Sequence, residues 1–381
     1  MTSQLNRPMK ILTLCYEYPP VGGGGGRVAA AVAAGLASKG HSVKVVSAGM
    51  KHLPKHAVIN GVEVYRPNSF RRHEERCTVF EMALYIITSF GRALWISLRW
   101  RPDVIHVHFI VPSGVLAFLV SILSHTPYVI TAHLGDVPGG VPEQTTTLFR
   151  IVNPFAKLIV SRAKAVTAVS TFVRDLLVSA YKCTPVVIVN GIDLTDAPQE
   201  IDSAVELRII MVGRMSIQKN PLMAVEACGR LKSDAWHLHL VGNGPLIPEV
   251  EALVAKLGLE RHVTFHGWLD ALQVQRLLRE SDVMLMPSRS EGMPVAAIEA
   301  LKHGVAIIGS RIPGLQDVLL DNKTGIACDM SAESFSQALE RVMLDASTLR
   351  NLRIGAQQHS INFNLDTIVH RYQECMLRTI N

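Results

Sequence analysis

Two glutamates, Glu291 and Glu299, have the type and spacing that most clearly suggest chemistry in this chain. Glu291 follows an apolar run at 282–287, which predicts a buried strand. Pro294 fits the first turn of a helix, where no backbone N–H is needed, and that helix would carry Glu299. Both carboxylates are therefore expected at the carboxyl end of a strand, where open α/β sheets bind ligands. Carboxylates accept hydrogen bonds from hydroxyls and a helix N-terminus attracts anions, so a nucleotide sugar would suit this place.

Two cations stand in a similar position earlier in the chain. Arg214 follows the apolar run 208–212, and Lys219 directly precedes Asn220 and Pro221, which would start a helix well. Two cations at a strand end suit a diphosphate leaving group, because they neutralise the negative charge that grows as a sugar departs. The alternative is that both side chains are simply solvated.

A glycine run follows the first predicted strand, at 9–15. It consists of Gly22, Gly23, Gly24, Gly25 and Gly26. Glycines let a ligand approach the backbone closely, and the helix expected to follow offers its N-terminus to anions. The run is not a P-loop, because no Gly-Lys-Ser/Thr follows, and it lacks the spacing of a dinucleotide fingerprint. A flexible turn is the alternative.

Three histidines form a third candidate group. His106 and His108 share one face of a predicted strand, and His133 ends the next apolar run. Three histidines could bind a metal, but we favour His133 as a hydrogen-bond partner for a sugar hydroxyl. The chain contains no Asp-x-Asp pair, so we expect no divalent metal and no other cofactor. Phosphate charge would then be met by Arg214, Lys219 and helix ends.

The elements that must position these residues alternate between strand and helix. Expected strands are 9–15, 42–48, 104–109, 128–132, 165–169, 186–189, 208–212, 236–241, 263–266 and 282–286. Helices between strands imply parallel sheets, and therefore an α/β fold. The pattern restarts after a polar stretch near 191–206, which indicates two doubly wound domains.

Composition agrees with a globular protein of two domains. The chain has 381 residues and is 48% hydrophobic and 18% charged. Its six cysteines are scattered without a Cys-x-x-Cys pair, which favours reduced thiols in the cytoplasm and argues against a structural zinc site. No secretory apolar segment is found near Met1.

Charge is distributed unevenly. Residues 1–190 hold 20 Lys and Arg against 9 Asp and Glu, whereas residues 191–381 hold 18 against 23. The basic half favours an anionic partner, such as a lipid surface or a phosphorylated acceptor, although solubility alone is an alternative. Nucleic acid is not expected as a partner, because the basic region lacks interleaved aromatic residues on strands.

Two apolar segments raise the question of a membrane. Residues 79–98 are interrupted by Glu81 and Arg92. Arginines flank this segment: Arg66, Arg71, Arg72, Arg76, Arg99 and Arg101. The pattern fits an amphipathic helix in a bilayer interface, or equally a helix that covers the first sheet. Residues 115–123 are too short to span a bilayer and predict a buried helix.

Taken together, these segments resemble the retaining glycosyltransferases of family 4, which have the GT-B fold. The resemblance is carried by Glu291 with Glu299, Val212-Gly213-Arg214 with Lys219, Asn190-Gly191-Ile192-Asp193, Val241-Gly242-Asn243-Gly244-Pro245, His266-Gly267-Trp268 and Gly314. It implies two Rossmann-like domains that face a central cleft. The first, 1–195, would bind the acceptor, and the second, 196–360, the nucleotide sugar. A last helix at about 360–381 would pack back on the first.

The resemblance also implies roles for single residues. Arg214 and Lys219 would hold the diphosphate, Glu299 the ribose and Glu291 the donor sugar. His133 would contact the sugar from across the cleft. The backbone of Gly292, Met293, Pro294 and Val295 would assist the sugar and phosphates, and Gly267, Trp268 and Leu269 would border the base.

The remaining implied residues belong to the first domain. Part of the glycine run would close on the diphosphate and the acceptor, and Asn190 is expected in the cleft. The family usually has about two glycines where this chain has five, so we expect a more mobile loop here. The catalytic group implied is thus Glu291, Lys219, Arg214 and His133.

The function implied is transfer of a sugar from a nucleotide sugar, with UDP as the expected leaving group, and with retention by front-face attack. The acceptor is expected to be lipid-linked or otherwise membrane-associated, in glycan or glycolipid synthesis. The protein would lie in the cytoplasm, peripheral on the inner face of the membrane. Alternatives are a soluble acceptor, a nucleotide-sugar epimerase, a dinucleotide-dependent oxidoreductase and a sugar-nucleotide sensor. The sequence leaves the base, the sugar and the oligomeric state open.

Overall fold

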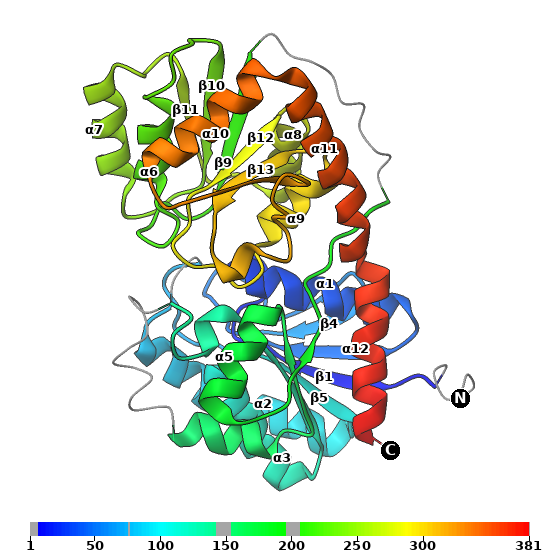
Figure 1. The fold of residues 1–381 in the computed structure, drawn as a ribbon. Coiled ribbons are helices and arrows are strands. Elements are labelled where there is room, and N and C mark those ends of the chain that lie inside the picture. The colour runs from blue at the N-terminus through cyan, green and yellow to red at the C-terminus, as the bar shows by residue number, and fades with distance from the viewer. Residues whose placement is uncertain (1–6, 75–76, 142–153, 196–205, 381) are drawn as a thin grey trace. The chain divides into compact units, whose positions relative to one another are not determined.

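The computed structural model describes residues 7–74, 77–141, 154–195 and 206–380 (Figure 1). The chain divides into two compact units. Unit 1 is Met1–Gly191 with Leu365–Asn381, and unit 2 is Ile192–Asn364. Most of the linker expected near 191–206, and Arg76 among the flanking arginines, lie outside the described residues.

Unit 1 contains an eight-stranded sheet in the order β3-β4-β2-β1-β5-β6-β7-β8. The strands are β1 Lys10–Leu14, β2 Ser42–Val46, β3 His56–Ile59, β4 Val62–Tyr65, β5 Val104–His108, β6 Tyr128–Ala132, β7 Ala165–Ala168 and β8 Val186–Val187. Neighbouring strands are parallel, except that β3 runs antiparallel to β4. The chain moves outward from β1 to β2 and later returns to β5, on the other side of β1. The gap between β1 and β5 is therefore the point at which strand order reverses, where ligands bind in sheets of this kind.

The helices of unit 1 cover both faces of this sheet. They are α1 Gly24–Ser38, α2 Val79–Trp100, α3 Val115–Ser124, α5 Thr171–Tyr181 and α12 Leu365–Ile380, with short helical turns η1 Ile110–Gly114 and η2 Leu134–Asp136. The crossovers β1–α1–β2 and β4–α2–β5 run in opposite directions along the sheet. Since such crossovers are right-handed, α1 and α2 lie on opposite faces, as Figure 1 shows. There α1 packs against α12, and α2 packs against α3.

The last helix joins unit 1 although it is the final element of the chain. α12 buries an apolar face that includes Ile368, Val369 and Met376. Gly35 of α1 permits the close approach, because a Cβ there would lie 2.5 Å from Val369 Cγ2. α12 corresponds to the helix expected at about 360–381.

Unit 2 contains a six-stranded sheet in the order β11-β10-β9-β12-β13-β14, parallel throughout. The strands are β9 Leu207–Val212, β10 Trp236–Val241, β11 Val263–Gly267, β12 Val283–Met286, β13 Ala306–Ser310 and β14 Gly325–Cys328. The helices are α6 Pro221–Cys228, α7 Ile247–Leu257, α8 Ala271–Arg279, α9 Val295–Lys302, α10 Ala332–Leu344 and α11 Ala346–Ser360, with turns η3 Pro313–Leu315 and η4 Ile361–Phe363. Strand order reverses between β9 and β12. The expected class, two Rossmann-like α/β units built on parallel sheets, is confirmed.

The sequence prediction was wrong or incomplete at several places. It gave no elements between the helix that carries Glu299 and the last helix, so β13, β14, α10 and α11 were not predicted. It missed the β3–β4 hairpin, whose edge strand β3 alternates between exposed and half-buried residues. It treated the whole glycine run as a loop, although α1 begins at Gly24. It also predicted a buried helix at 115–123, whereas α3 buries Leu116, Ala117 and Val120 and exposes its other side.

Candidate active site

In unit 2, the loops that follow β9 and β12 are joined to each other. The Arg289 N–H donates to the Gln218 carbonyl (2.8 Å), and Gln218 Nε2 donates to the Ser290 carbonyl (3.0 Å). These two loops carry the predicted cations and the first predicted glutamate. The strand-order reversal of this sheet therefore coincides with the candidate site, as expected for a doubly wound fold.

Lys219 and Glu291 form an ion pair at this point. Lys219 Nζ lies 2.6 Å from Glu291 Oε1, and the side chains are 20% and 6% exposed. A charge-assisted hydrogen bond of this kind fixes both groups. Two glycines, Gly213 and Gly314, make room for this ion pair. A Cβ at Gly213 would lie 3.3 Å from Lys219 Cε, and a Cβ at Gly314 would lie 1.6 Å from the Glu291 carbonyl oxygen.

The second cation, Arg214, lies in the same loop as Lys219, and the second glutamate, Glu299, lies on α9, which follows the loop of Glu291. Arg214 directly follows Gly213 and is exposed, and its side chain has no ion pair among the described residues. Glu299 is 6% exposed and lies on α9. Asn220 starts α6 through a left-handed backbone (φ 55°) instead of the expected side-chain cap. The site thus combines a fixed Lys–Glu pair with an accessible arginine.

The loop after β12 places its backbone against the start of α9. Gly292, Met293 and Pro294 are buried, and Pro294 stands at the N-cap of α9, which begins at Val295. The first N–H groups of a helix have no partner within the helix and favour an anion. These N–H groups can donate to a phosphate or to the hydroxyl oxygens of a sugar beside Glu291.

A third loop system completes the carboxyl edge of the unit 2 sheet. Gly242 N–H donates to the Gly267 carbonyl (2.7 Å), and Met215 N–H donates to the Asn243 carbonyl (3.0 Å). Gly244 is required by close packing, since its Cβ would lie 2.2 Å from the Met215 carbonyl oxygen. After Gly267 the chain exposes Trp268, at 65%, and half-buries Leu269. The Trp268 ring is therefore accessible to a flat ligand such as a base.

The opposite edge of the same two strands holds a different set of charges. Asp282, before β12, accepts from Arg208 Nε (2.9 Å) and from Arg353 Nη1 (2.6 Å). Arg353 is 1% exposed and also donates to the Gly304 carbonyl (2.9 Å). The sequence analysis missed this network, whose members lie 71 and 74 residues apart. Its groups are satisfied by one another, so we assign it to the stability of unit 2.

In unit 1, the glycine run meets Phe109 and His133. A Cβ at Gly25 would lie 2.5 Å from Phe109 Cζ and 3.4 Å from His133 Nδ1. Phe109 follows β5 with a left-handed backbone (φ 74°), which aims its ring at this place. Phe109 and His133 rings pack with centroids 4.5 Å apart. The sequence analysis missed Phe109, for which a single sequence gives no signal.

The start of the glycine run is tied to the body of unit 1. Gly22 N–H donates to the Glu74 carbonyl (2.8 Å), and Gly23 N–H donates to Glu17 Oε2 (3.1 Å). A Cβ at Gly22 or Gly26 would overlap Glu17, whereas Gly23 has nothing within 4 Å of an added Cβ. Gly24, Gly25 and Gly26 form the first turn of α1. Gly23 is therefore the position with room for a Cβ, unlike Gly22, Gly25 and Gly26, and Glu17 is an anchor that was not predicted from the sequence.

The three histidines form a chain within unit 1. His106 Nε2 lies 2.9 Å from Thr131 Oγ1, and His108 Nδ1 lies 3.3 Å from His133 Nε2. Burial lowers the pKa of His133 to about 4 and that of His106 to about 3, the latter with a further contribution from His133. Burial likewise lowers the pKa of His108 well below its ordinary value. All three are thus neutral at pH 7, and no group able to hold a metal is found in the described parts of the chain.

Asp136 orients the segment that carries His133. Its carboxylate accepts from the N–H of His133 (2.8 Å) and from the N–H of Ile110 (2.9 Å). Burial raises the pKa of Asp136 to about 7, although these hydrogen bonds oppose the shift. Asn190 is also buried in unit 1, beside Gly191. The predicted site residues therefore fall into two sets: His133, Asn190 and the glycine run in unit 1, and all others in unit 2.

Two families match the chain, one after the other. Residues 22–196 match the family described as glycosyltransferase family 4, and residues 198–359 match the family described as glycosyl transferases group 1. An uncharacterized glycosyltransferase of Methanocaldococcus jannaschii is 27% identical over 88% of this chain and 90% of its own length.

Solved structures share the fold. Sucrose-phosphate synthase from Thermosynechococcus elongatus superposes with a TM-score of 0.84 at 20% identity, over 96% of this chain and 98% of that one. HepE of Anabaena, in complex with UDP-glucose, gives a TM-score of 0.76 at 18% identity, over 96% and 99%. At these identities the likeness establishes the fold.

Proposed function

Since the chain belongs to glycosyltransferase family 4 and has the GT-B fold, we propose that it transfers a sugar from UDP to a membrane-associated acceptor. The observation that carries the donor part is the Lys219–Glu291 pair at the strand-order reversal of unit 2, with exposed Arg214 beside it. HepE of Anabaena, which shares the fold, is solved with UDP-glucose, and this supports the choice of a uridine nucleotide.

Each unit 2 residue has a task that follows from its chemistry. Arg214 and Lys219 hold the diphosphate and neutralise its growing charge, which is the largest electrostatic demand of the reaction. Glu291 accepts a hydrogen bond from a hydroxyl of the donor sugar and keeps Lys219 in place. Glu299 accepts from the ribose. The ring of Trp268 borders the base.

The bond change is a substitution at the anomeric carbon. The acceptor oxygen forms the new bond on the face from which the phosphate leaves, and the acceptor proton passes to a phosphate oxygen. Front-face attack retains the anomeric configuration without a carboxylate nucleophile, unlike the double displacement of retaining glycosidases. Proton NMR of the glycoside product reports the configuration at its anomeric carbon, and an inverted product would rule the route out.

We propose that no metal takes part, because Arg214, Lys219 and the N-terminus of α9 already provide positive charge for the diphosphate. Turnover should therefore persist unchanged in excess EDTA. A complete loss that Mg²⁺ or Mn²⁺ restores would contradict this.

In unit 1, we propose that His133 and the start of α1 contact ligands of the same reaction. The neutral imidazole of His133 can donate to or accept from a sugar hydroxyl at pH 7. Gly23 leaves open space for a ligand at the N-terminus of α1, and Asn190 is proposed as a further ligand contact.

The acceptor is proposed to be membrane-associated because of the basic first half of the chain and the arginines around α2, and the protein would be a peripheral protein of the cytoplasmic membrane face. A soluble acceptor is the second candidate, favoured by the sucrose-phosphate synthase among its structural relatives.

A thermal-shift screen of nucleotides tests the donor assignment. A ligand that binds only the folded state raises the melting temperature, so UDP and one UDP-sugar should give the largest rise among uridine, adenosine and guanosine diphosphates and their sugars. Product analysis by mass spectrometry with membrane extract or soluble sugars then identifies the acceptor. A rise with none of these nucleotides would refute the proposed function.

A further inference from the structure

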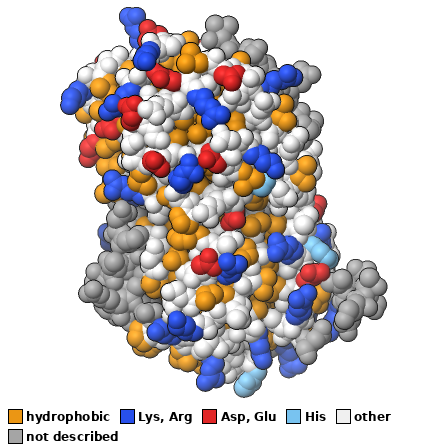
Figure 2. Space-filling model, in the orientation of Figure 1, with side chains coloured by type: hydrophobic (Ala, Val, Ile, Leu, Met, Phe, Trp, Pro, Cys, Tyr) orange, Lys and Arg blue, Asp and Glu red, His pale blue; other side chains and the backbone are white. Residues whose placement is uncertain are grey.

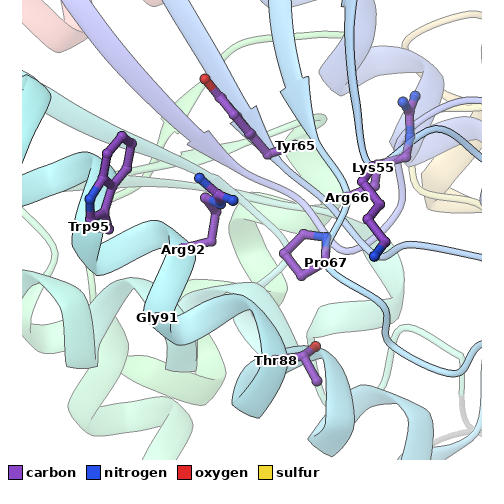
Figure 3. A pocket seen from close by; sticks show the side chains of 8 residues that line it. All are labelled: Lys55, Tyr65, Arg66, Pro67, Thr88, Gly91, Arg92 and Trp95. Carbon is purple, nitrogen blue, oxygen red and sulfur yellow. The ribbon is translucent and has the colours of Figure 1, made fainter.

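A pocket in unit 1 is not used by the proposed transfer reaction. It has a volume of about 540 Å³ and lies between α2 and the segment that contains the β3–β4 hairpin. Figure 3 shows Trp95, Arg92 and Thr88 on successive turns of α2, with Lys55 across from Arg92 and Trp95. Tyr65 contributes its ring from β4.

The lining of this pocket is positively charged. It includes Lys55, Arg66 and Arg92, and none of its residues is acidic among those described. Arg66 donates to the Pro19 carbonyl (2.9 Å), so its guanidinium is partly engaged elsewhere. Lys55 and Arg92 are exposed, and their side chains make no ion pair within the described residues. Two cations are therefore available to an anion in the pocket.

Aromatic rings fix the position of one of these cations. The Arg92 guanidinium carbon lies 5.3 Å from the centre of the Tyr65 ring and 5.6 Å from that of Trp95, distances at which a cation and an aromatic face attract. The nearby acid Glu63 is already engaged by Lys44 (3.2 Å) and by the Tyr65 hydroxyl (2.7 Å). Because Glu63 is engaged by these two groups, the Arg92 guanidinium has no carboxylate partner among the described residues and can bind an external anion.

An apolar stripe on α2 passes beside the pocket. Phe80, Ile87, Trp95 and Leu98 follow helical spacing and are 71%, 70%, 52% and 52% exposed. α2 is long and apolar enough to cross a membrane, but its other face is buried in unit 1. Helices with one apolar face and flanking cations lie in the bilayer interface. The exposed apolar face of α2 can therefore insert into the headgroup layer, with the helix axis parallel to the membrane plane.

Charge on unit 1 agrees with this placement. Residues 1–190 hold 20 Lys and Arg against 9 Asp and Glu, and Figure 2 shows Lys and Arg side chains spread over one face of unit 1. The cytoplasmic leaflet of membranes carries anionic lipids, which attract such surfaces. The charge therefore favours an anionic membrane as the partner of this surface.

We propose that this pocket binds the phosphate headgroup of an anionic bilayer lipid while the stripe of Phe80, Ile87, Trp95 and Leu98 lies in the interface. The phosphate oxygens accept from Arg92 and Lys55, and the lipid chains extend along the stripe. This deepens the membrane part of the proposed function, on which it rests, by naming the site of contact. It requires neither donor nor sugar transfer.

Vesicle sedimentation with a matched pair of variants tests the pocket. The variants are Arg92→Gln, inside the pocket, and Arg99→Gln, on the same helix but outside its lining. The wild type should bind phosphatidylcholine vesicles that contain about one-third phosphatidic acid, and should bind pure phosphatidylcholine much more weakly. Loss of one surface charge costs about fivefold in membrane affinity, which is the expectation for Arg99→Gln. Arg92→Gln should lose at least tenfold more.

Two outcomes would overturn the proposal. Equal losses for both variants would mean that the surface acts only through its total charge. Tight binding of inorganic phosphate or glycerol phosphate that depends on Arg92, without vesicle binding, would mean that the pocket serves a soluble phosphate. Circular dichroism melting of each variant confirms that it is folded.

A third variant tests the stripe. Ile87→Ser removes an exposed side chain and should weaken vesicle binding about tenfold without changing melting. Binding equal to wild type would remove the stripe from the proposal. The UDP thermal shift is measured on the same samples. If UDP binds and vesicles do not, this inference fails and the donor assignment stands; if vesicles bind and UDP does not, the reverse holds.

Discussion

The loops after β9 and β12 gather charged side chains, whereas the carboxyl ends of β1, β5 and β6 gather glycines, an aromatic ring and neutral histidines. Both places are the strand-order reversals of their sheets. In unit 2, Lys219 and Glu291 are 2.6 Å apart and Arg214 is exposed. In unit 1, burial lowers the pKa of His133 to about 4. The His133 side chain beside the glycine run is therefore uncharged at pH 7.

This difference indicates that topology prepares a place for a ligand and that side chains decide which ligand it receives. A diphosphate needs fixed positive charge, which unit 2 supplies. In unit 1, the imidazole of His133, which is neutral at pH 7, and the open space beside Gly23 suit a hydroxyl. Four predictions test the two places, the charged loops of unit 2 and the glycines and histidines of unit 1.

The largest effect is expected from Lys219→Ala. Loss of one strong electrostatic donor to the leaving group should lower kcat by about 10²–10³, or about 3 kcal/mol. Steady-state kinetics with the donor identified in the nucleotide screen measures it. The control is Lys256→Ala, an exposed lysine of α7 in the same unit. Near-normal kcat for a folded Lys219→Ala enzyme would contradict the assignment of Lys219 to the leaving diphosphate.

A somewhat smaller effect is expected within the glycine run. Gly25→Ala places a Cβ 2.5 Å from Phe109 Cζ, and overpacking of this kind costs about 1–3 kcal/mol. Gly23→Ala meets nothing within 4 Å and should stay within about 0.5 kcal/mol of wild type. Urea unfolding of both variants gives the difference. Equal stabilities would show that the run does not pack on Phe109 as described.

The neutral histidines predict loss of stability at acid pH. Burial lowers the pKa of His106 to about 3, below its value of about 6.5 in the unfolded chain. Below pH 6.5 the unfolded chain therefore binds more protons, and the free energy of unfolding falls as pH falls. Between pH 6.5 and 5 this amounts to roughly 1.5 kcal/mol for one such histidine. His106→Gln should flatten the dependence by that amount, and an unchanged pH dependence in a folded His106→Gln variant would contradict the prediction.

The smallest effect is the salt dependence of nucleotide binding. Raising NaCl from about 0.1 to 1 M shortens the screening length from about 10 to 3 Å, so UDP should bind severalfold more weakly at the partly exposed cations of unit 2. Uridine lacks the diphosphate and should show little change. The same salt dependence for both ligands would contradict a charged diphosphate site.

The proximity of Lys219 and Glu291 in unit 2 could be predicted from the sequence. Lys219 and Glu291 each follow an apolar run, and the ends of parallel strands meet at one edge of a sheet, so local pattern sufficed. The Arg208–Asp282–Arg353 network could not be predicted in this way. Its members lie far apart in the chain, and only the packed structure brings them together.

Unit 1 shows where local pattern fails. Glycine has low helix propensity, so Gly24, Gly25 and Gly26 gave no signal of a helix; their place in α1 depends on contacts with Phe109 and Glu17. The edge strand β3, His56–Ile59, has only four residues, and its three consecutive apolar residues do not alternate with polar ones in the sequence. The sequence of α3 is apolar on all sides, so it does not show which residues are packed against unit 1. The exposed side of α3 could therefore not be predicted.

Calorimetric titration of UDP tests the central claim, that the strand-order reversal of unit 2 is the donor site, most directly. The wild type and Lys256→Ala should bind UDP with the same affinity, and folded Lys219→Ala should bind it at least about tenfold more weakly, which is a difference of about 1.4 kcal/mol. Equal UDP affinity in all three proteins would contradict the claim, because the diphosphate would then bind away from Lys219.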